Sequence, residues 1–131
     1  MRIDKIRDTI FATAFGFLTT HELDAVRNVE WRILPPLRWM PDEIGMTVFI
    51  VAHVPLFVWL VSACWGQNLQ SRQKVRSLFA GFCCVHVGLH WLLRNDPSYL
   101  FQGWLSNGLI GGAGFAGALF LFMTYRGKHL R

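Results

Sequence analysis

The chain has 131 residues, of which 53% are apolar and 16% are charged, and its lysines and arginines outnumber its acidic residues by 13 to 8. This composition indicates an integral membrane protein and excludes a separate soluble domain. The net charge of +5 needs no nucleic-acid partner, because basic loops that face anionic lipid account for it.

Four apolar stretches follow one another along the chain, separated by short charged or turn-forming segments. A helix that rises ~1.5 Å per residue needs ~20 residues to cross ~30 Å of hydrocarbon, so the chain has room for about four spans. We therefore predict an all-α fold, in which residues 1–131 form a single transmembrane domain and a bundle of four transmembrane helices. The predicted spans cover about residues 9–27, 44–65, 76–94 and 98–125.

The first apolar run also has the length of the core of a secretory signal peptide. However, Asp4 and Asp8 dilute the positive charge that precedes such a core, and no small-x-small cleavage site follows the run. We therefore interpret it as the first span.

The connection between the first two predicted spans contains Trp31, Trp39 and the pair Pro35-Pro36. Tryptophan favours the headgroup layer of a membrane, and consecutive prolines stop a helix. We expect this segment to lie along the outer membrane surface, either as an anchor or as a lid over nearby polar residues.

The fourth predicted span is rich in glycine, and Gly108 and Gly112 have the small-xxx-small spacing that lets helices approach closely. This spacing predicts either tight packing inside the bundle or a homodimer contact through the fourth helix.

The positive charges predict the orientation of the bundle, because short basic loops stay cytoplasmic. With four spans, one side of the membrane holds nine lysines and arginines, in the N-terminus, the middle loop and the C-terminus. The other side holds four: Arg27, Arg32, Arg38 and Arg94. Both termini are therefore predicted to be cytoplasmic, and the inner (cytoplasmic) membrane of a bacterium is the expected location.

Four of the five histidines lie inside the predicted spans, where an ionisable side chain costs roughly 2.5 kcal/mol or more and tends to mark a functional site. Counting ~1.5 Å per residue from the outer end of each span places all four roughly 6 to 15 Å below the outer surface. The four are His21, His53, His86 and His90. Each could by itself be a hydrogen-bonding contact between helices. Their shared depth on three spans instead predicts one common polar site.

Helical spacing indicates which residues share a face with these histidines. His86 and His90 are four residues apart, and His21 and Asp24 are three apart. Glu22 lies on the same turn as His21, and Asn107 of the fourth span lies at a similar depth. We expect Glu22 and Asn107 beside a group of metal ligands that consists of His21, Asp24, His53, His86 and His90.

Imidazole nitrogen and carboxylate oxygen are the ligands that zinc takes in a tetrahedral shell, and a catalytic site leaves one position for water. Glu22 and Asp24 are the candidate catalytic residues, with Glu22 as the general base toward that water. Iron bound by two histidines and a carboxylate is also compatible, as is a dinuclear iron centre if Glu22 and Glu30 both join. The expected cofactor is a divalent transition metal, with zinc favoured and iron as the alternative.

The sequence resembles a known group of proteins in this region. The motif His-Glu-Leu-Asp-Ala at residues 21–25, followed by Glu-Trp-Arg at residues 30–32, a proline-rich loop and a histidine in the next span, looks like a group of small, uncharacterised bacterial membrane proteins. It is similar, more distantly, to HXXEE-domain proteins, although Asp24 and Ala25 stand where that motif has its two glutamates. The resemblance implies a small multi-spanning membrane protein and no particular activity.

Three functions are compatible with these residues. The first is a metal-dependent intramembrane enzyme, a hydrolase or hydroxylase, that acts on a membrane lipid or another apolar substrate, with hydrolysis favoured over oxidation. The second is an ion-handling, proton-handling or transport protein, in which histidines and acids relay protons or hold an ion. The third is a b-type haem protein, with haem held between His53 and either His86 or His90.

Overall fold

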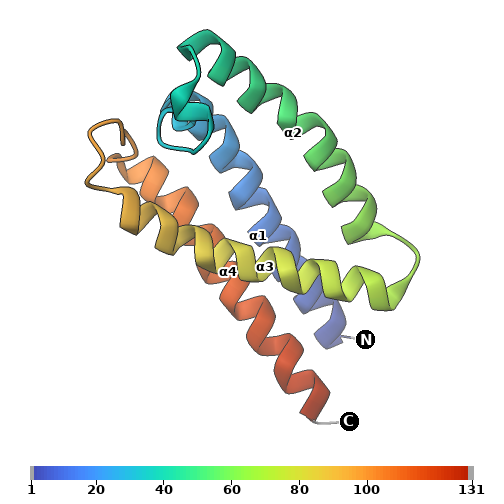
Figure 1. Ribbon diagram of the computed structural model, residues 1–131. Helices are drawn as coiled ribbons and strands as arrows, with labels where there is room; N and C mark the ends of the chain where they lie inside the picture. Colours follow the sequence, from blue (N-terminus) through green and yellow to red (C-terminus); the bar gives the residue numbers. More distant parts are fainter. Residues whose placement is uncertain (1, 130–131) are drawn as a thin grey trace.

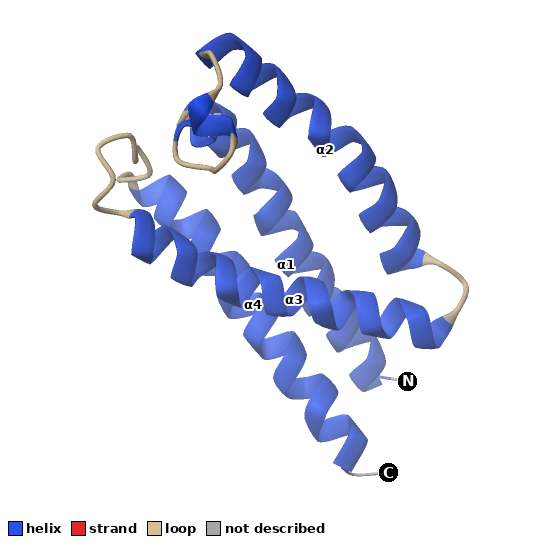
Figure 2. Cartoon of the chain, viewed as in Figure 1, coloured by secondary structure: helices blue, strands red, loops and turns tan. Residues whose placement is uncertain are grey.

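The computed structural model describes residues 2–129 of the chain and the side chains of residues 4–127. Within these residues all regular structure is helical, which confirms the predicted all-α class (Figure 2). Four long helices are joined by short connections, and two 3-10 helices lie between the first and second (Figure 1). The elements are α1 (Arg2–Arg27), η1 (Glu30–Arg32), η2 (Leu37–Trp39), α2 (Asp42–Trp65), α3 (Leu69–Leu93) and α4 (Trp104–His129).

Three of these helices, α2, α3 and α4, are long and apolar enough to cross a membrane. Helix α1 is as long as α4, but its last turns carry the polar side chains of His21, Glu22 and Asp24. These side chains lower the mean hydropathy of α1, so α1 is not among the helices that are apolar enough to cross a membrane. The membrane crossing by α1 therefore stays a prediction.

The helices run alternately up and down the molecule, so both described chain ends and the α2–α3 connection lie toward one end (Figure 1). The two 3-10 helices and the α3–α4 connection lie at the opposite end. Helix α4 packs against both α1 and α3, whereas α2 contacts mainly α3 and the 3-10 helices. The bundle therefore has a tightly packed part of three helices and a more exposed fourth helix, α2.

Glycines on α4 make the tight packing possible. A Cβ atom at Gly117 would lie 2.7 Å from the backbone oxygen of Ala80 on α3, and one at Gly112 would lie 2.7 Å from the ring of Phe17 on α1. Lipid tails are as apolar as leucine, so close packing of this kind is what holds membrane helices together. Gly108, by contrast, has no atom within 4 Å of such a Cβ. The predicted tight packing inside the bundle is therefore present at Gly112, while a dimer through α4 stays a prediction.

Several helix boundaries differ from the predicted spans. Helix α4 begins at Trp104 and not at residue 98, because residues 98–103 form an irregular connection after Pro97. Helix α3 begins at Leu69, seven residues before the predicted span, where the Asn68 side chain accepts a hydrogen bond from the backbone N–H of Ser71 at 2.9 Å. Helix α2 is continuous through Pro55.

Arg76, whose charge was counted with the middle loop in predicting the orientation, is a buried residue of α3. Its Nε donates to the backbone oxygen of Cys64 at 2.8 Å, and its Nη1 donates to Asp8 Oδ1 at 2.7 Å. The carbonyls in the last turn of α2 lack helical partners, which is why the Cys64 oxygen is free to accept. Arg76 therefore joins α1, α2 and α3 at the end of the molecule that holds the termini.

The segment between α1 and α2 is only partly at the surface. Trp39 is exposed, as an interfacial position predicts. Trp31 is buried against Phe49, and its Nε1 donates to Asp42 Oδ1 at 2.8 Å, so this side chain does not lie at the surface as expected. The short 3-10 helices turn the chain back over the bundle, which brings Trp31 and its neighbour Glu30 inside.

Candidate metal site

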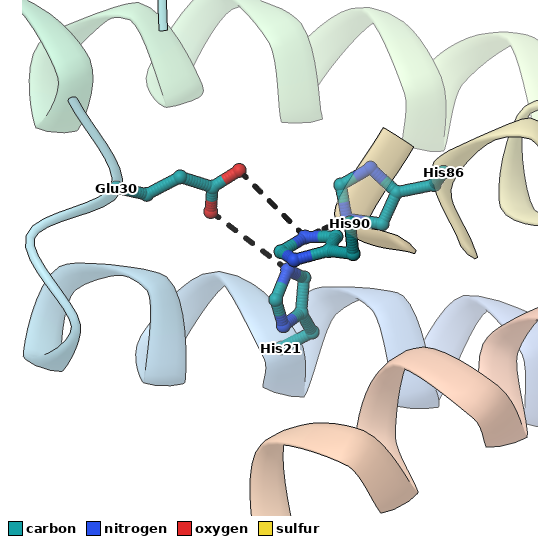
Figure 3. A group of neighbouring side chains, drawn as sticks. All are labelled: His21, Glu30, His86 and His90. Atoms are coloured by element: carbon teal, nitrogen blue, oxygen red, sulfur yellow. Dashed lines mark hydrogen bonds and ion pairs between the residues drawn. The ribbon is translucent and has the colours of Figure 1, made fainter. Parts of the chain in front are cut away.

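Three histidines and one glutamate meet between α1, η1 and α3 (Figure 3). His21 comes from α1, His86 and His90 come from one face of α3, and Glu30 comes from η1. All four are buried, with His21 completely inaccessible. Residues that are 65 positions apart in the chain, His21 and His86, thus form one group that no single helix could provide.

The donor atoms of this group face one another. His86 Nε2 and His90 Nε2 are 3.1 Å apart, His21 Nε2 is 3.8 Å from Glu30 Oε2, and His90 Nε2 is 4.0 Å from Glu30 Oε1 (Figure 3). One donor atom from each residue lies within 4.8 Å of all the others. A tetrahedral zinc ion with bonds of about 2.0–2.2 Å holds its ligands roughly 3.4 Å apart. Shifts of about one ångström or less would therefore close the group around such an ion.

Several polar atoms of the group lack any partner within the described part of the chain. Neither ring nitrogen of His21 has a hydrogen bond, and neither has Glu30 Oε2. Leaving a buried donor or acceptor unsatisfied costs about 1–3 kcal/mol per atom. A cation bound by His21 Nε2 and Glu30 Oε2 would give both of these atoms a partner, which supplies a reason to keep them buried.

Glu30 reaches the histidines because the chain reverses at Val29. Val29 has φ 50° and ψ 46°, the left-handed conformation in which a β-branched residue is unfavourable. This conformation ends α1 and directs the next residue back toward the bundle. Two side chains of η1 then hold the turn in place, since Arg32 and Trp31 both donate hydrogen bonds to Asp42 at the start of α2.

The surroundings of Glu30 favour its neutral form in the metal-free protein. Burial, together with the negative charges of Glu22 and Asp24, raises the pKa of Glu30 to about 8. A metal ion would reverse this balance, because its positive charge favours the carboxylate.

Aromatic side chains from the α3–α4 connection close the group from the other side. The Tyr99 hydroxyl lies 3.1 Å from His90 Nδ1, and the Phe101 ring packs against the rings of His21 and His90. For His90 to bind a metal through Nε2, its Nδ1 carries the proton and donates to the Tyr99 oxygen. Partners of this kind fix the ring orientation of histidine ligands in metal sites.

His53 does not belong to this group, although the sequence analysis placed it there. Its Nε2 lies 2.9 Å from Glu22 Oε2, and its Nδ1 lies 2.6 Å from the Phe49 backbone oxygen. The shared depth of the four histidines is therefore not sufficient to bring them together. His53 lies on α2, the helix that packs least closely on the others, and the side chain nearest to it across the gap is that of Glu22.

The other predicted residues also lie outside the four-residue group. Asp24 is buried with one carboxylate oxygen, Oδ2, unpartnered, but its place among the ligand atoms is taken by Glu30. Asn107 is exposed and lines a cavity on the far side of His90. Glu22 is engaged with His53.

The sequence analysis gave Glu30 a role only in a dinuclear iron centre, and it did not consider Tyr99. No sequence pattern by itself indicated that Glu30 is a ligand, because its approach depends on the inward fold of the segment around Trp31, which only the structure shows. Nothing in the local sequence indicated Tyr99, since its position depends on the irregular connection between α3 and α4.

A comparison with protein families gives a match over residues 7–127, to a family of unknown function, DUF6713. The matched family is uncharacterised, as the resemblance of the motif at residues 21–32 implied, whereas the likeness to HXXEE-domain proteins stays a prediction. No curated protein and no solved structure matches the chain. Because the family match covers nearly the whole sequence, the chain belongs to the family of unknown function DUF6713.

Proposed function

We propose that this protein is a membrane metalloprotein in which His21, His86, His90 and Glu30 hold one divalent transition metal. The observation that carries the proposal is the convergence of four buried donor atoms from three elements, two of which, His21 Nε2 and Glu30 Oε2, make no hydrogen bond within the described residues. Three imidazole nitrogens and one carboxylate oxygen suit zinc best, and iron is the alternative.

The proposed activity is the metal-dependent hydrolysis of a membrane lipid or another apolar substrate, with oxidation as the less favoured reaction. A divalent metal supplies Lewis-acid polarisation of a carbonyl and an activated water at neutral pH. Four protein ligands fill a tetrahedral shell, so catalysis requires one of them to give way. Glu30 is the ligand suited to this, because it lies on a three-residue 3-10 helix while the histidines lie on long helices. A displaced Glu30 carboxylate then accepts a proton close to the reacting atoms.

A second candidate function, proton handling, is favoured by the pair Glu22 and His53. The Phe49 backbone oxygen can only accept a hydrogen bond, so His53 Nδ1 must carry a proton and donate it. The 2.9 Å contact between His53 Nε2 and Glu22 Oε2 then holds one further proton, on either the imidazole or the carboxyl. A shared proton between two helices is a feature of intramembrane proton relays. Haem is less well supported, because both ring nitrogens of His53 already have partners.

The proposed location is the inner membrane of a bacterium, with all four long helices in the lipid. Membrane lipid is the proposed partner and the source of a lipid-like substrate. A homodimer through the glycine-rich helix α4 remains part of the proposal.

Metal analysis of the detergent-purified protein tests the metal site. We expect about one zinc or iron per chain after dialysis, loss of that metal in His86→Ala, and full metal content in His53→Ala. The two variants each remove one intramembrane histidine and therefore serve as matched controls. A wild-type protein without metal, whose melting temperature does not change when zinc is added, would overturn the proposal. Equal metal loss in both variants would overturn the assignment of the four ligands.

Lipid hydrolysis tests the reaction. The metal-loaded protein is reconstituted in phospholipid vesicles, and released fatty acid is measured by mass spectrometry, with His86→Ala as the control. Release by the wild type alone supports hydrolysis. Equal release from both preparations contradicts it.

A further inference from the structure

A cavity of about 430 Å³ lies between the outer ends of α3 and α4, under the connection that joins them. Its walls include the apolar side chains of Trp91, Phe101 and Ile110. Its volume falls in the range of roughly 300–1,000 Å³ that is usual for small-molecule sites. The cavity shares His90 with the four-residue metal group, but it lies on the Tyr99 side of that residue, and none of the other three ligands lines it.

One positive charge and several amides line the same cavity. Arg94 lies at the end of α3 with its guanidinium 4.2 Å from the centre of the Trp91 ring, and the amides of Gln102 and Asn107 come from the facing segment and α4. The ring contact holds the guanidinium at the cavity while leaving its N–H groups available. Arginine and amide N–H groups are the donors that bind carboxylate or phosphate.

Arg94 lacks the carboxylate partner that several other arginines of the described chain have. Four arginines of the described chain form ion pairs with aspartate, namely Arg7, Arg32, Arg38 and Arg76. No acidic residue among residues 4–127 forms an ion pair with Arg94, although it lies beside an apolar cavity at the predicted membrane surface.

We infer that this cavity binds an anionic amphiphile, a single acyl chain with a carboxylate or phosphate head. The head contacts Arg94 and the neighbouring amides, and the first part of the chain lies against Trp91, Phe101 and Ile110. The rest of the chain extends out of the cavity into the surrounding lipid. An uncharged lipid of the same length lacks the head that Arg94 binds.

This inference does not need the metal, so binding is tested on metal-depleted protein in an uncharged detergent. Oleate and lysophosphatidate are titrated against monoolein and inorganic phosphate, and binding is measured by native mass spectrometry. We expect oleate, lysophosphatidate or both to bind, with monoolein at least tenfold weaker. Inorganic phosphate at the same concentration should not compete. Equal binding of monoolein overturns the role of the charge, and competition by phosphate alone overturns the role of the acyl chain.

Two pairs of variants locate the site. Arg94→Gln should weaken binding about tenfold, whereas Arg27→Gln, which removes an exposed arginine on another helix at the same end, should not. Gly111→Leu places a side chain in the cavity from α4, where a Cβ meets no atom within 4 Å, and should abolish binding. Gly108→Leu adds the same side chain outside the cavity and should have no effect. If the two variants of either pair weaken binding equally, the inference is overturned. If Arg94→Gln does not fold, the comparison of the two glycine variants decides whether the cavity is the binding site.

Discussion

Single residues carry most of the argument for a metal. His21 is fully buried with two nitrogens that lack partners, in a place where a leucine of similar volume would pack without that cost. Glu30 is buried beside it through a turn that requires an unfavourable conformation at Val29. The unpaired nitrogens of His21 and the unfavourable backbone of Val29 both cost stability, and both bring metal-binding atoms to the same place. This indicates that the place is a functional site.

The pH dependence of stability tests the environment of Glu30. Its pKa is raised from about 4.5 in the unfolded chain to about 8 in the folded, metal-free protein. A raised carboxyl pKa contributes stability that is complete below the unfolded value and is lost as pH rises through the folded value. We therefore expect the stability of the metal-free wild type, measured relative to Glu30→Gln, to fall by about 2–5 kcal/mol between pH 4.5 and pH 8. Thermal melts in detergent across this range measure it.

Glu30→Gln supplies the control, because glutamine does not titrate. The difference in stability between the wild type and this variant isolates Glu30, because the two proteins share every other titratable group. Zinc should bind more tightly to the wild type as pH rises toward 8, since the metal requires the carboxylate. Parallel pH profiles for the two proteins would show that Glu30 is not the group responsible.

The pair Glu22 and His53 predicts a measurable coupling between α1 and α2. Each of the variants Glu22→Ala and His53→Ala should lower stability, and the double variant should lose less than the sum. Hydrogen bonds between membrane helices suggest a coupling energy of about 1 kcal/mol. A double-mutant cycle from unfolding in mixed micelles measures it. Additive effects would mean that the 2.9 Å contact contributes nothing to helix association.

At the scale of the helices, the faces of α4 have different roles. Gly112, Gly114 and Gly117 contact side chains or backbone of α1 and α3, whereas Gly108 and Gly111 face open space. The inner glycines bring the backbones together, and the resulting close approach positions α3 so that His86 and His90 face α1.

Substitutions on the two faces should therefore have different effects. In Gly117→Ala the added Cβ would lie 2.7 Å from the Ala80 backbone oxygen, so helices α3 and α4 must move apart. We expect a loss of about 1–3 kcal/mol, in the range of overpacked cores. Gly108→Ala adds the same methyl group to open space and should be neutral within about 0.5 kcal/mol. Thermal melts of the two variants compare them, and an equal loss would place the tight contact elsewhere.

At the scale of the whole molecule, the ends of the bundle differ in charge and in structure. The described chain ends and the α2–α3 connection share one end, where the lysines and arginines are concentrated (Figure 1). The opposite end holds the 3-10 helices, the metal group and the cavity. An up-and-down bundle with this distribution predicts that the basic end faces the cytoplasm.

Reporter fusions test this orientation and the crossing by α1 together. Fluorescent-protein fusions at either terminus and at residue 67 should be bright, because that reporter folds in the cytoplasm. Alkaline phosphatase inserted at residue 95 should be active, because it requires the oxidising side of the membrane. If α1 does not cross the membrane, the N-terminus lies on the outer side, and the N-terminal fluorescent-protein fusion alone will be dark. An active phosphatase at residue 67 would reverse the predicted orientation.

Much of the fold was predictable because it depends on local sequence. Apolar runs of about 20 residues specify long helices in a membrane protein whatever their neighbours are, and the spacing of His86 and His90 specifies that they share a face. The start of α4 was less predictable, since residues 98–103 are apolar enough to extend a helix but are instead held against the bundle by buried Tyr99 and Phe101.

The membership of the site shows where local reasoning ends. Sequence alone determined that His21, His86 and His90 are polar residues at one depth in an apolar bundle, because rise per residue and helical periodicity are properties of each helix by itself. Only the tertiary structure decided that Glu30 joins them and that His53 does not. The first outcome depends on the chain reversal at Val29, and the second depends on how far α2 lies from the other helices and which way its face is turned. The position of Glu30 and the position of α2 are both set by packing between elements. The periodicity of residues along one helix does not predict such packing.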